Sequence, residues 1–302
     1  MGDIVYISGA TGLVGKAIAE KLKEQNISIG VLTRNAEKAK NEIPFADDII
    51  ETNYEDIDIS EKIGNAKGVV NLAGANINGK RWTEEYKQII YNSRIKVTRY
   101  LAEQINAAES KPEVFVSVSG INYYGNKQDE KLTEESTSGS DFLANVTKDW
   151  EKEANKAIGV RKVIPRLGVV LDRKDGAFPQ MMTPVKFFVG GKLGTGRQWF
   201  SWIHLEDVAA LFCEAVLNES WEGVYNFASP DPVRNKTFIK KLASRLNRPA
   251  IFAVPEFALK AVIGEAAELI TASLRVIPEK LLQSGYEFKY NNIDEAFDEL
   301  VN

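Results

Sequence analysis

The sequence of residues 4–15 is Ile4-Val5-Tyr6-Ile7-Ser8-Gly9-Ala10-Thr11-Gly12-Leu13-Val14-Gly15. The residues before Gly9 predict a buried strand, and the pattern from Leu13 onward predicts a helix. A strand, a glycine turn and a helix in this order are what a dinucleotide phosphate needs. Three glycines alone mark turns more often than ligands, so the flanking strand and helix carry the prediction of a nucleotide site.

Each glycine of this turn has its own expected task. Gly9 makes the tight turn, Gly12 removes the Cβ that would keep a pyrophosphate away, and Gly15 lets the helix pack against the strand. The free N–H groups and the positive dipole end of the helix then face the phosphates. The residues expected to bind them are Gly9, Thr11, Gly12, Leu13, Val14 and Gly15.

Strand-like and helical segments alternate through the first half of the chain. Strands are predicted at residues 4–8, 28–33, 48–51, 68–72, 114–118 and 160–164, and helices at 13–24, 83–108 and 141–157. Thr83 is the expected N-cap of the long helix. Such alternation predicts an α/β fold with a doubly wound, mainly parallel sheet, whose ligands lie at the carboxyl ends of the strands.

The alternation breaks down after Leu171. A strand at 198–202, a helix at 205–217 and a strand at 224–228 follow a segment rich in Gly, Pro, Phe and Met, and the last 70 or so residues look like helices separated by prolines. We therefore expect one domain at 1–228, with a substrate-side insertion at about 172–197. A smaller C-terminal substrate lobe is expected at 229–302.

Composition excludes several classes of protein. The net charge is −4, with 38 basic and 42 acidic residues, and the basic residues show no stripe, so nucleic acid is not an expected partner. No apolar run approaches the roughly 18 residues that a membrane span needs, so no membrane partner is expected. One cysteine, Cys213, and one histidine, His204, cannot make a zinc site, and no metal is expected. Cys213 is predicted to be a buried hydrophobe in a reducing, cytoplasmic setting, and His204 to open a helix.

The end of the second predicted strand indicates which dinucleotide binds. NAD sites place a carboxylate there to bind the ribose 2′-hydroxyl, but this chain has Thr33 and Arg34. An arginine fork suits a phosphate dianion, so Arg34 predicts NADP(H). One charge-assisted hydrogen bond of about 1.5 to 3 kcal/mol would favour NADP by roughly tenfold to a hundredfold. The alternative is a solvated surface arginine.

Two further strand ends carry candidate site residues. Leu72, Ala73 and Gly74 follow one strand, and the small residues in this segment would let the nicotinamide ribose come close to the backbone. The alternative is an ordinary turn, since Ala-Gly also occurs in turns after strands. After the next strand, Ser119, Tyr123 and Tyr124 could polarise a carbonyl and move a proton. A tyrosine in that role needs a nearby cation to lower its pKa, and Lys148 is the candidate. The alternative is a packed aromatic before a turn.

These motifs together resemble the extended short-chain dehydrogenase/reductase superfamily. The matching segments are residues 9–15, 71–74, 119–125, 165–171 and 202–209. Within it the chain is similar to an epimerase-like "NAD-dependent epimerase/dehydratase" subfamily, through residues 79–83, 123–125, 193–199, 201–204 and an end segment at about 249–290. The resemblance covers essentially the whole chain. It implies a Rossmann domain, a substrate lobe and NADP(H), in agreement with Arg34.

The chain departs from the superfamily where the chemistry is done. Lys148 is preceded at the usual tyrosine spacing by Ala144, and the usual Ser/Thr falls on Gly120. Either Tyr123 or Tyr124 acts with Ser119 and Lys148 instead, or the protein binds cofactor without hydride chemistry. The leading interpretation is an NADP(H)-dependent oxidoreductase or epimerase of an unidentified small molecule, with a nucleotide sugar as one candidate. The alternative is a cofactor-binding sensor or interaction protein.

Three residues are candidates for the substrate pocket. Arg197 could hold an anionic group, with Trp199 and Trp202 shaping the walls. The alternative is a glycine-rich loop with packed tryptophans. The oligomeric state stays open, although many superfamily members form dimers through helices corresponding to 83–108 and 141–157.

Overall fold

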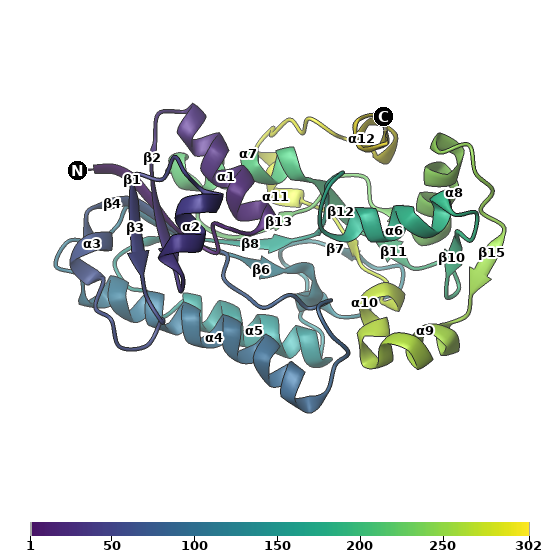
Figure 1. Cartoon of the computed structure of the whole chain (residues 1–302), viewed down its shortest axis with the longest axis horizontal. Coiled ribbons are helices and arrows are strands. Elements are labelled where there is room, and N and C mark those ends of the chain that lie inside the picture. The colour runs from purple at the N-terminus through teal and green to yellow at the C-terminus, as the bar shows by residue number, and fades with distance from the viewer. Residues whose placement is uncertain (1, 302) are drawn as a thin grey trace.

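A computed structural model describes residues 2–301, and its centre is a parallel sheet (Figure 1). Seven strands lie in the order β13-β8-β5-β4-β1-β2-β3, and a short eighth, β6, pairs with β8. The bounds are β1 Gly2–Ser8, β2 Ser28–Thr33, β3 Asp48–Glu51, β4 Ala66–Asn71, β5 Val114–Ser117, β6 Ser119–Gly120, β8 Arg161–Leu167 and β13 Gly223–Phe227. Every pairing in this sheet is parallel, which confirms the predicted doubly wound α/β fold.

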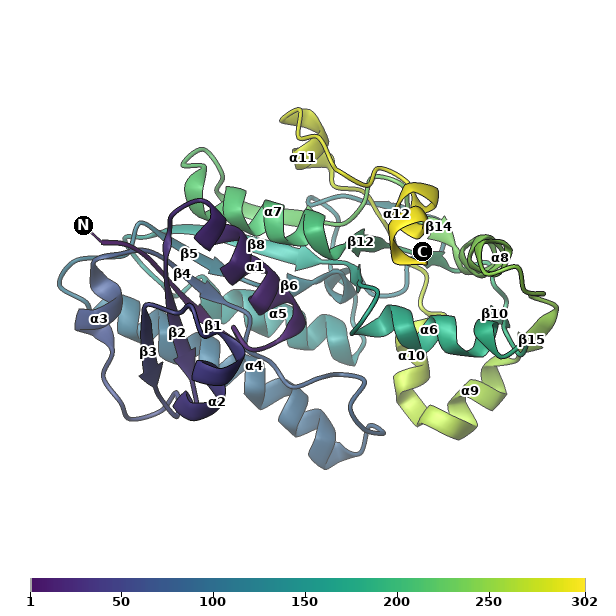
Figure 2. The ribbon, with the colours of Figure 1, turned by 45° about the horizontal axis from the view of Figure 1, so that its top comes forward.

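Helices cover both faces of the sheet (Figure 2). One face carries α1 (Leu13–Glu24) and α7 (Leu205–Leu217), and the other carries α4 (Glu84–Ala107) and α5 (Phe142–Ala154). Two shorter helices, α2 (Ala36–Glu42) and α3 (Ser60–Gly64), connect strands near the β3 edge. Two apolar clusters fill the two layers between sheet and helices. The sheet is thus buried on both sides, which leaves its ends as the place for ligands.

Short polar side chains fix where the two helices of one face begin. Thr83 accepts a hydrogen bond from Tyr86 N at 3.2 Å and caps α4, as predicted. Asp141 accepts one from Ala144 N at 2.9 Å and caps α5. A side-chain cap of this kind contributes about 1 kcal/mol by satisfying an otherwise free N–H group.

A second lobe extends from the carboxyl end of the sheet. Its elements are β7 Lys131–Leu132, β9 Val169–Leu171, α6 Ala177–Lys186, β10 Gly191–Leu193, β11 Trp199–Phe200, β12 Trp202–His204, β14 Val233–Arg234, α8 Asn235–Arg245, β15 Phe252–Val254, α9 Glu256–Ile263, η2 Gly264–Ala267, α10 Glu268–Thr271, β16 Arg275–Val276, α11 Glu279–Gln283 and α12 Ile293–Leu300. Four strand pairs join segments far apart in sequence: β9–β12, β10–β15, β11–β14 and β7–β16. The lobe is therefore built from 169–204 and 229–301, together with β7 at 131–132. Residues 1 and 302, the ends of the two predicted domains, lie outside the described residues.

Most element boundaries follow the sequence pattern, and the exceptions have physical causes. The single strand predicted at 198–202 is two strands, because Ser201 turns its hydroxyl to donate to Leu274 O at 2.7 Å. The helix α2 was not predicted, since its sequence is polar and short. Cys213 is buried as expected, and burial raises the pKa of its thiol to about 12.

Two features of residues 2–301 bear on the expected partners. No helix in that range is long and apolar enough to cross a membrane. No cluster of three or more His, Cys, Asp or Glu side chains there could hold a metal ion.

Candidate functional site

The glycine turn after β1 has the shape that its sequence predicts. Gly9 has a φ of +77°, and a Cβ on it would lie 3.0 Å from the carbonyl carbon of Leu72. A Cβ on Gly15 would lie 2.4 Å from Gly9 O, so the helix packs on the turn too closely for any side chain. A Cβ on Gly12 would meet only Gly9 O, at 3.4 Å, and Gly12 is exposed. The turn therefore has no space for added atoms at Gly9 and Gly15, whereas it has free space at Gly12.

The first turn of α1 offers free backbone donors at this opening. Gly12 is its N-cap and provides no side-chain hydrogen bond, unlike Thr83 and Asp141 at the starts of α4 and α5. The N–H groups of the first turn have no partner within the helix. An anion placed against Gly12 would meet these donors and the positive end of the helix dipole. The residues present therefore fit a dinucleotide pyrophosphate.

The end of β2 presents a positive charge beside this turn. Arg34 is exposed and has no ion-pair partner within residues 2–301. The next residue, Asn35, accepts from Lys38 N at 2.8 Å and caps α2, and Thr33 Oγ1 accepts from Asn35 N at 3.1 Å. Glu51, at the end of β3, accepts a hydrogen bond from Ala36 N at 2.8 Å, so this backbone N–H group at the start of α2 already has a partner. Arg34 remains free for an external phosphate.

A buried polar network, which we did not predict from the sequence, holds the ends of β1, β4 and β5 together. Asn71 accepts from Ser8 Oγ at 2.8 Å, and its amide nitrogen donates to Thr98 Oγ1 at 2.8 Å and Ser117 Oγ at 3.2 Å. Trp150 also donates to Thr98, at 2.7 Å. This network fixes the residues that follow Asn71, namely Leu72, Ala73 and Gly74, and Leu72 N donates to Ser8 O beside Gly9. A buried Asn at the end of an apolar strand was the available sequence signal.

A second residue that the sequence reasoning missed is Arg94 on α4. Its guanidinium donates to Ala75 O at 3.1 Å and to Ile90 O at 3.0 Å, and it lies 5.2 Å from the centroid of the Trp150 ring. A Cβ on Gly74 would be 3.1 Å from its Cζ, so the loop passes directly over it. No carboxylate within residues 2–301 pairs with Arg94, and burial lowers its pKa to about 10. An uncompensated cation under this loop favours an anionic ligand.

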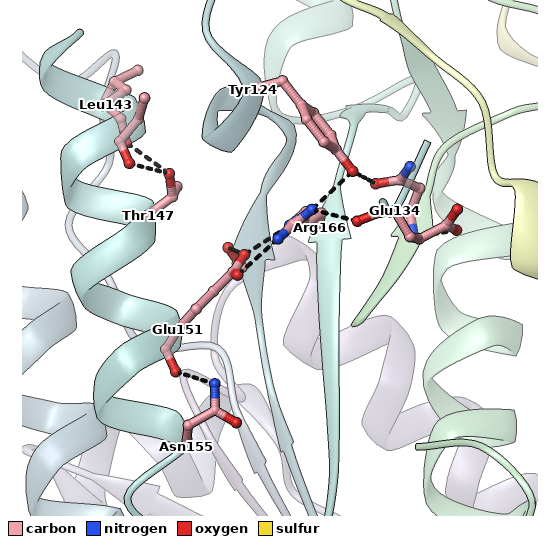
Figure 3. A network of polar contacts seen from close by, with 10 residues as sticks. Tyr124, Glu134, Leu143, Thr147, Glu151, Asn155 and Arg166 are labelled. Atoms are coloured by element: carbon pink, nitrogen blue, oxygen red, sulfur yellow. Dashed lines mark hydrogen bonds and ion pairs between the residues drawn. The ribbon is translucent and has the colours of Figure 1, made fainter. Parts of the chain in front are cut away.

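Ser119 and Tyr124 belong to a buried network around an ion pair (Figure 3). Arg166 on β8 donates from Nε and Nη2 to the two carboxylate oxygens of Glu151 on α5, at 2.8 and 2.9 Å. Ser119 Oγ donates to Glu151 at 2.7 Å. Tyr124 accepts from Arg166 at 3.0 Å and donates to Asn226 Oδ1 at 2.6 Å. The network ties α5 to β6, β8, η1 (Ile121–Tyr124) and β13.

The environment of this network fixes its protonation. Burial opposes the charge of Arg166, but the hydrogen bonds and charge of Glu151 outweigh it and raise the pKa of the guanidinium. Burial raises the pKa of Tyr124 to about 12, in spite of Arg166 beside it. Tyr124 is thus a neutral, fully buried hydroxyl at neutral pH.

Tyr123 and Lys148 are placed differently from the two hydroxyls just described. The side chains of Tyr123 and Lys148 are only partly buried. The Tyr123 ring lies under the Arg166 guanidinium, whose Cζ is 3.4 Å from the ring centroid. Within residues 2–301 no hydrogen bond joins Lys148 to Tyr123 or Tyr124, so the cation facing the tyrosines is Arg166 rather than the expected lysine. Ala144 is fully buried at the usual tyrosine position.

One buried carboxylate oxygen beside this network has no partner. Glu134 accepts from Asn226 N at 3.0 Å through Oε1, while its Oε2 is buried without a hydrogen bond. Burial raises the pKa of this carboxyl above its ordinary value, and backbone hydrogen bonds offset only part of that shift.

The C-terminal lobe contains a cavity of about 660 Å³ next to the turn at residues 194–198. Arg197 lines it, with Arg234, Lys236, Gln128 and Ser273 among the other residues. The lining is mostly polar and carries more basic than acidic groups, which suits an anionic ligand.

The other two substrate-pocket candidates do not themselves line the cavity, although Trp199 contacts its lining residues Asp129 and Arg234. Trp199 donates from Nε1 to Asp129 at 3.0 Å and is packed between the guanidinium groups of Arg234 and Arg275, at 4.1 and 4.5 Å from its ring. Trp202 is fully buried in the lobe core and donates to Asp231 O at 2.9 Å. Of the three candidates, Arg197 lines the cavity, and Trp202 instead belongs to the apolar core of the lobe.

His204 has the structural position expected of it. Its Nδ1 accepts from Glu206 N at 3.2 Å and caps α7, and its ring stacks on Tyr290 at 3.9 Å.

Comparisons with known proteins agree with this geometry. Residues 5–148 match the model of the NAD dependent epimerase/dehydratase family, and residues 254–300 match a domain of unknown function, DUF1731. The chain is 40% identical to the chloroplastic epimerase family protein SDR39U1 homolog of Arabidopsis thaliana, over 97% of this chain and 85% of that one. It is 37% identical to the epimerase family protein YfhF of Bacillus subtilis, over 98% and 97% of the two chains.

Two solved structures extend the comparison. Human epimerase family protein SDR39U1 (isoform 2), crystallised with NADPH, has a TM-score of 0.89 and 28% identity and covers 98% of each chain. A nucleoside-diphosphate sugar epimerase from Corynebacterium glutamicum has a TM-score of 0.79 and 29% identity, over 99% of this chain and 58% of that one.

Proposed function

This chain belongs to the NAD dependent epimerase/dehydratase family, and we propose that it binds NADP(H) at the carboxyl edge of its sheet and acts there on a small polar molecule. The observation that carries the proposal is the open glycine turn at Gly12, with the uncapped start of α1 behind it and the unpaired Arg34 beside it. NADPH in the human relative supports the same cofactor here. A reducing, cytoplasmic compartment remains part of the proposal.

Arg34 is the proposed ligand of the 2′-phosphate. Replacing it in Arg34→Ala should weaken NADPH binding by about tenfold to a hundredfold, because one charge-assisted hydrogen bond of about 1.5 to 3 kcal/mol is lost. NADH binding should change little. Titration of both cofactors by isothermal calorimetry measures the two effects. The matched control is Lys40→Ala, an exposed cation at the far end of α2. Equal losses for NADPH and NADH would overturn this assignment.

When bound, NADP(H) supplies a hydride acceptor or donor, and the proton must be handled by the protein. We assign that task to Tyr123, with Lys148 orienting the ligand. Ser119 and Tyr124 then act as positioning residues, since their hydroxyls are already engaged with Glu151, Arg166 and Asn226.

Paired tyrosine variants separate these roles. Tyr123→Phe should lower turnover about a hundredfold or more, as loss of a general acid or base does, while its melting temperature stays the same. Tyr124→Phe should instead lower the melting temperature, because Arg166 and Asn226 each lose a buried partner. Two assays measure turnover over one panel of compounds: oxidation of NADPH by carbonyl compounds, followed by absorbance, and conversion of nucleotide sugars to their epimers with NADP⁺ present, followed by chromatography of the sugar products. Full activity of Tyr123→Phe would contradict the assignment.

The sensor alternative is favoured by one observation: Ala144 and Gly120 remove both side chains that usually do the chemistry. The same panel decides between the two functions. Turnover of any member supports the enzyme, whereas tight NADPH binding with no turnover across the panel supports the sensor.

The proposed substrate class carries an anionic group that enters the cavity beside Arg197. A nucleoside diphosphate fits the size and charge of this cavity, and the Corynebacterium relative is named for such substrates. UDP is the probe we would titrate. Arg197→Ala should weaken UDP binding about tenfold, while Arg173→Ala, an exposed arginine between β9 and α6 that does not line the cavity, should not. UDP binding that is absent from the wild type would exclude this substrate class.

A further inference from the structure

An apolar tip lies at the free end of the C-terminal lobe. It is formed by Phe187, Phe188 and Val189, which follow α6, and by Ile251 and Phe252 at β15, and each is at least half exposed. Phe187 and Ile251 are 73% and 79% exposed. Figures 1 and 2 place α6, β10 and β15 at the end of the molecule opposite β1–β3. Exposed clusters of large apolar side chains mark interaction surfaces.

The two segments of the apolar tip are adjacent in space. Gly191, two residues after Val189, pairs with Phe252 in the β10–β15 ladder. Arg248, three residues before Ile251, lies over the Phe188 ring at 4.5 Å from the centroid. The five side chains therefore form one apolar surface rather than two separate patches.

Basic residues are concentrated around this tip, although the whole chain has a net charge of −4. No acidic residue occurs between Asp175 and Glu206 or between Asp231 and Glu256. The two stretches hold the basic residues Lys186, Lys192, Arg197, Arg234, Lys236, Lys240, Lys241, Arg245 and Arg248. Arg234, Lys241 and Arg245 pair with acidic residues from outside the two stretches, which leaves the positive charge to the other six. Because β10 pairs with β15 and β11 with β14, the fold brings both stretches together.

Three of these lysines border a hollow in the apolar tip. Lys192, Lys236 and Lys240 line a cavity of about 210 Å³ whose other walls are Ile239, Ala250, Ile251 and Phe252. Within residues 2–301 none of the three lysines has an ion-pair partner, whereas Lys241 on the other side of α8 pairs with Asp294. The hollow thus combines unpaired positive charge with an apolar wall.

We propose that the apolar tip docks on a membrane surface that contains anionic phospholipid. Phe187, Phe188 and Phe252 enter the boundary between headgroups and acyl chains, and the lysines of the hollow bind lipid phosphates. Such surface association needs no membrane-spanning helix. It revises the expectation of no membrane partner, which rested on the lack of an apolar run long enough to span a membrane.

Charge complementarity favours this occupant over a second copy of the chain. A symmetric dimer through the tip would place the same lysines on both sides of the contact, with no acidic residue in either stretch to receive them. An anionic lipid surface matches both the unpaired lysines and the exposed apolar side chains of the tip. Each lysine near such a surface is attracted to it, and the aromatic side chains bury apolar area in it.

Flotation of the full chain with vesicles tests the proposal. We expect binding to vesicles of phosphatidylcholine mixed with phosphatidylglycerol, weaker binding at high salt, and little binding to phosphatidylcholine alone. Each lysine neutralised should reduce the partition coefficient about fivefold, so Lys192→Gln with Lys240→Gln should reduce it by about twenty-fivefold. Lys236 is left intact because it also lines the larger cavity.

Matched variants elsewhere on the molecule serve as controls. Lys40→Gln with Lys62→Gln removes the same charge from the sheet domain, and Ile158→Ser removes an apolar side chain that is 72% exposed there. Phe187→Ser with Phe252→Ser should abolish flotation, whereas Ile158→Ser should not. All variants should keep the wild-type melting temperature and NADPH affinity.

Three outcomes would overturn the proposal. The wild type could fail to float with anionic vesicles, it could float equally well with phosphatidylcholine alone, or the controls could lose as much binding as the tip variants. A wild-type dimer that Phe252→Ser dissociates, with no flotation, would assign the tip to self-association instead.

Discussion

At the scale of single residues, the least expected feature is a complete ion pair inside the protein. Arg166 and Glu151 are both buried and bind each other through two hydrogen bonds, with Ser119 and Tyr124 as further partners. Such a pair contributes little net stability when intact, because both charges were desolvated. Losing one member is costly, because the other remains charged and buried.

Glu151→Gln should therefore destabilise the protein strongly. We expect the free energy of unfolding to fall by about 3 to 5 kcal/mol, since Arg166 loses its counter-charge. Urea denaturation followed by circular dichroism measures this. The control is Glu24→Gln, which breaks an exposed pair with Lys21 and should cost about 0 to 1 kcal/mol. Similar small losses for both variants would show that Arg166 is not held by Glu151.

Glu134 predicts a pH dependence of stability. Burial raises the pKa of its carboxyl in the folded state, so the folded protein holds this proton more tightly than the unfolded chain. The resulting stability is present below the unfolded pKa and is lost as pH rises through the folded pKa. Glu134→Gln has no carboxyl group at this position to ionise, so the variant does not lose this stability as pH rises. The difference in melting temperature, variant minus wild type, should therefore be larger at pH 8 than at pH 4.

Differential scanning fluorimetry across this pH range checks the prediction. Glu135→Gln, at the neighbouring exposed position, is the control and should give a flat difference. A difference for Glu134→Gln that does not grow with pH would mean that its carboxyl titrates normally.

At the scale of elements, the sequence pattern predicted those helices and strands whose ends are determined by residues within the segment itself. The bounds of β2, β3, α1 and α7 agree with the prediction because apolar periodicity, glycines and caps lie within each segment. The short strands of the lobe could not be predicted, since each has two or three residues and exists only through a partner distant in sequence. The glycine turn was predicted in full, whereas Arg94 joined the candidate site only through the fold.

Two glycine variants in this turn should have opposite effects. Gly15→Ala should unfold or strongly destabilise the protein, because its Cβ would lie 2.4 Å from Gly9 O. Gly12→Ala should fold normally, since its Cβ meets only one atom at 3.4 Å, but should lose NADPH affinity because the methyl group fills the opening. Thermal melting and NADPH titration measure the two properties. A Gly12→Ala variant with wild-type affinity would place the pyrophosphate elsewhere.

At the scale of the whole molecule, the fold separates three surfaces that composition averages together. The sheet edge holds the proposed cofactor site, the 660 Å³ cavity lies in the lobe, and the apolar tip lies at the lobe's far end. The overall charge of −4 hid the basic lobe, because its two acid-free stretches are separated in sequence by residues 206–231, which carry acidic groups only. The buried network of Arg166, Glu151, Ser119 and Tyr124 could not be predicted from the sequence, because its members come from segments far apart in the chain.

The central claim is that this edge of the sheet is built for a cofactor with a 2′-phosphate. Parallel calorimetric titrations of the wild-type protein with NADPH and NADH test it most directly. We expect NADPH to bind at least about tenfold more tightly than NADH, because Arg34 stands unpaired where NAD sites carry a carboxylate. Equal affinity, or tighter binding of NADH, would contradict it.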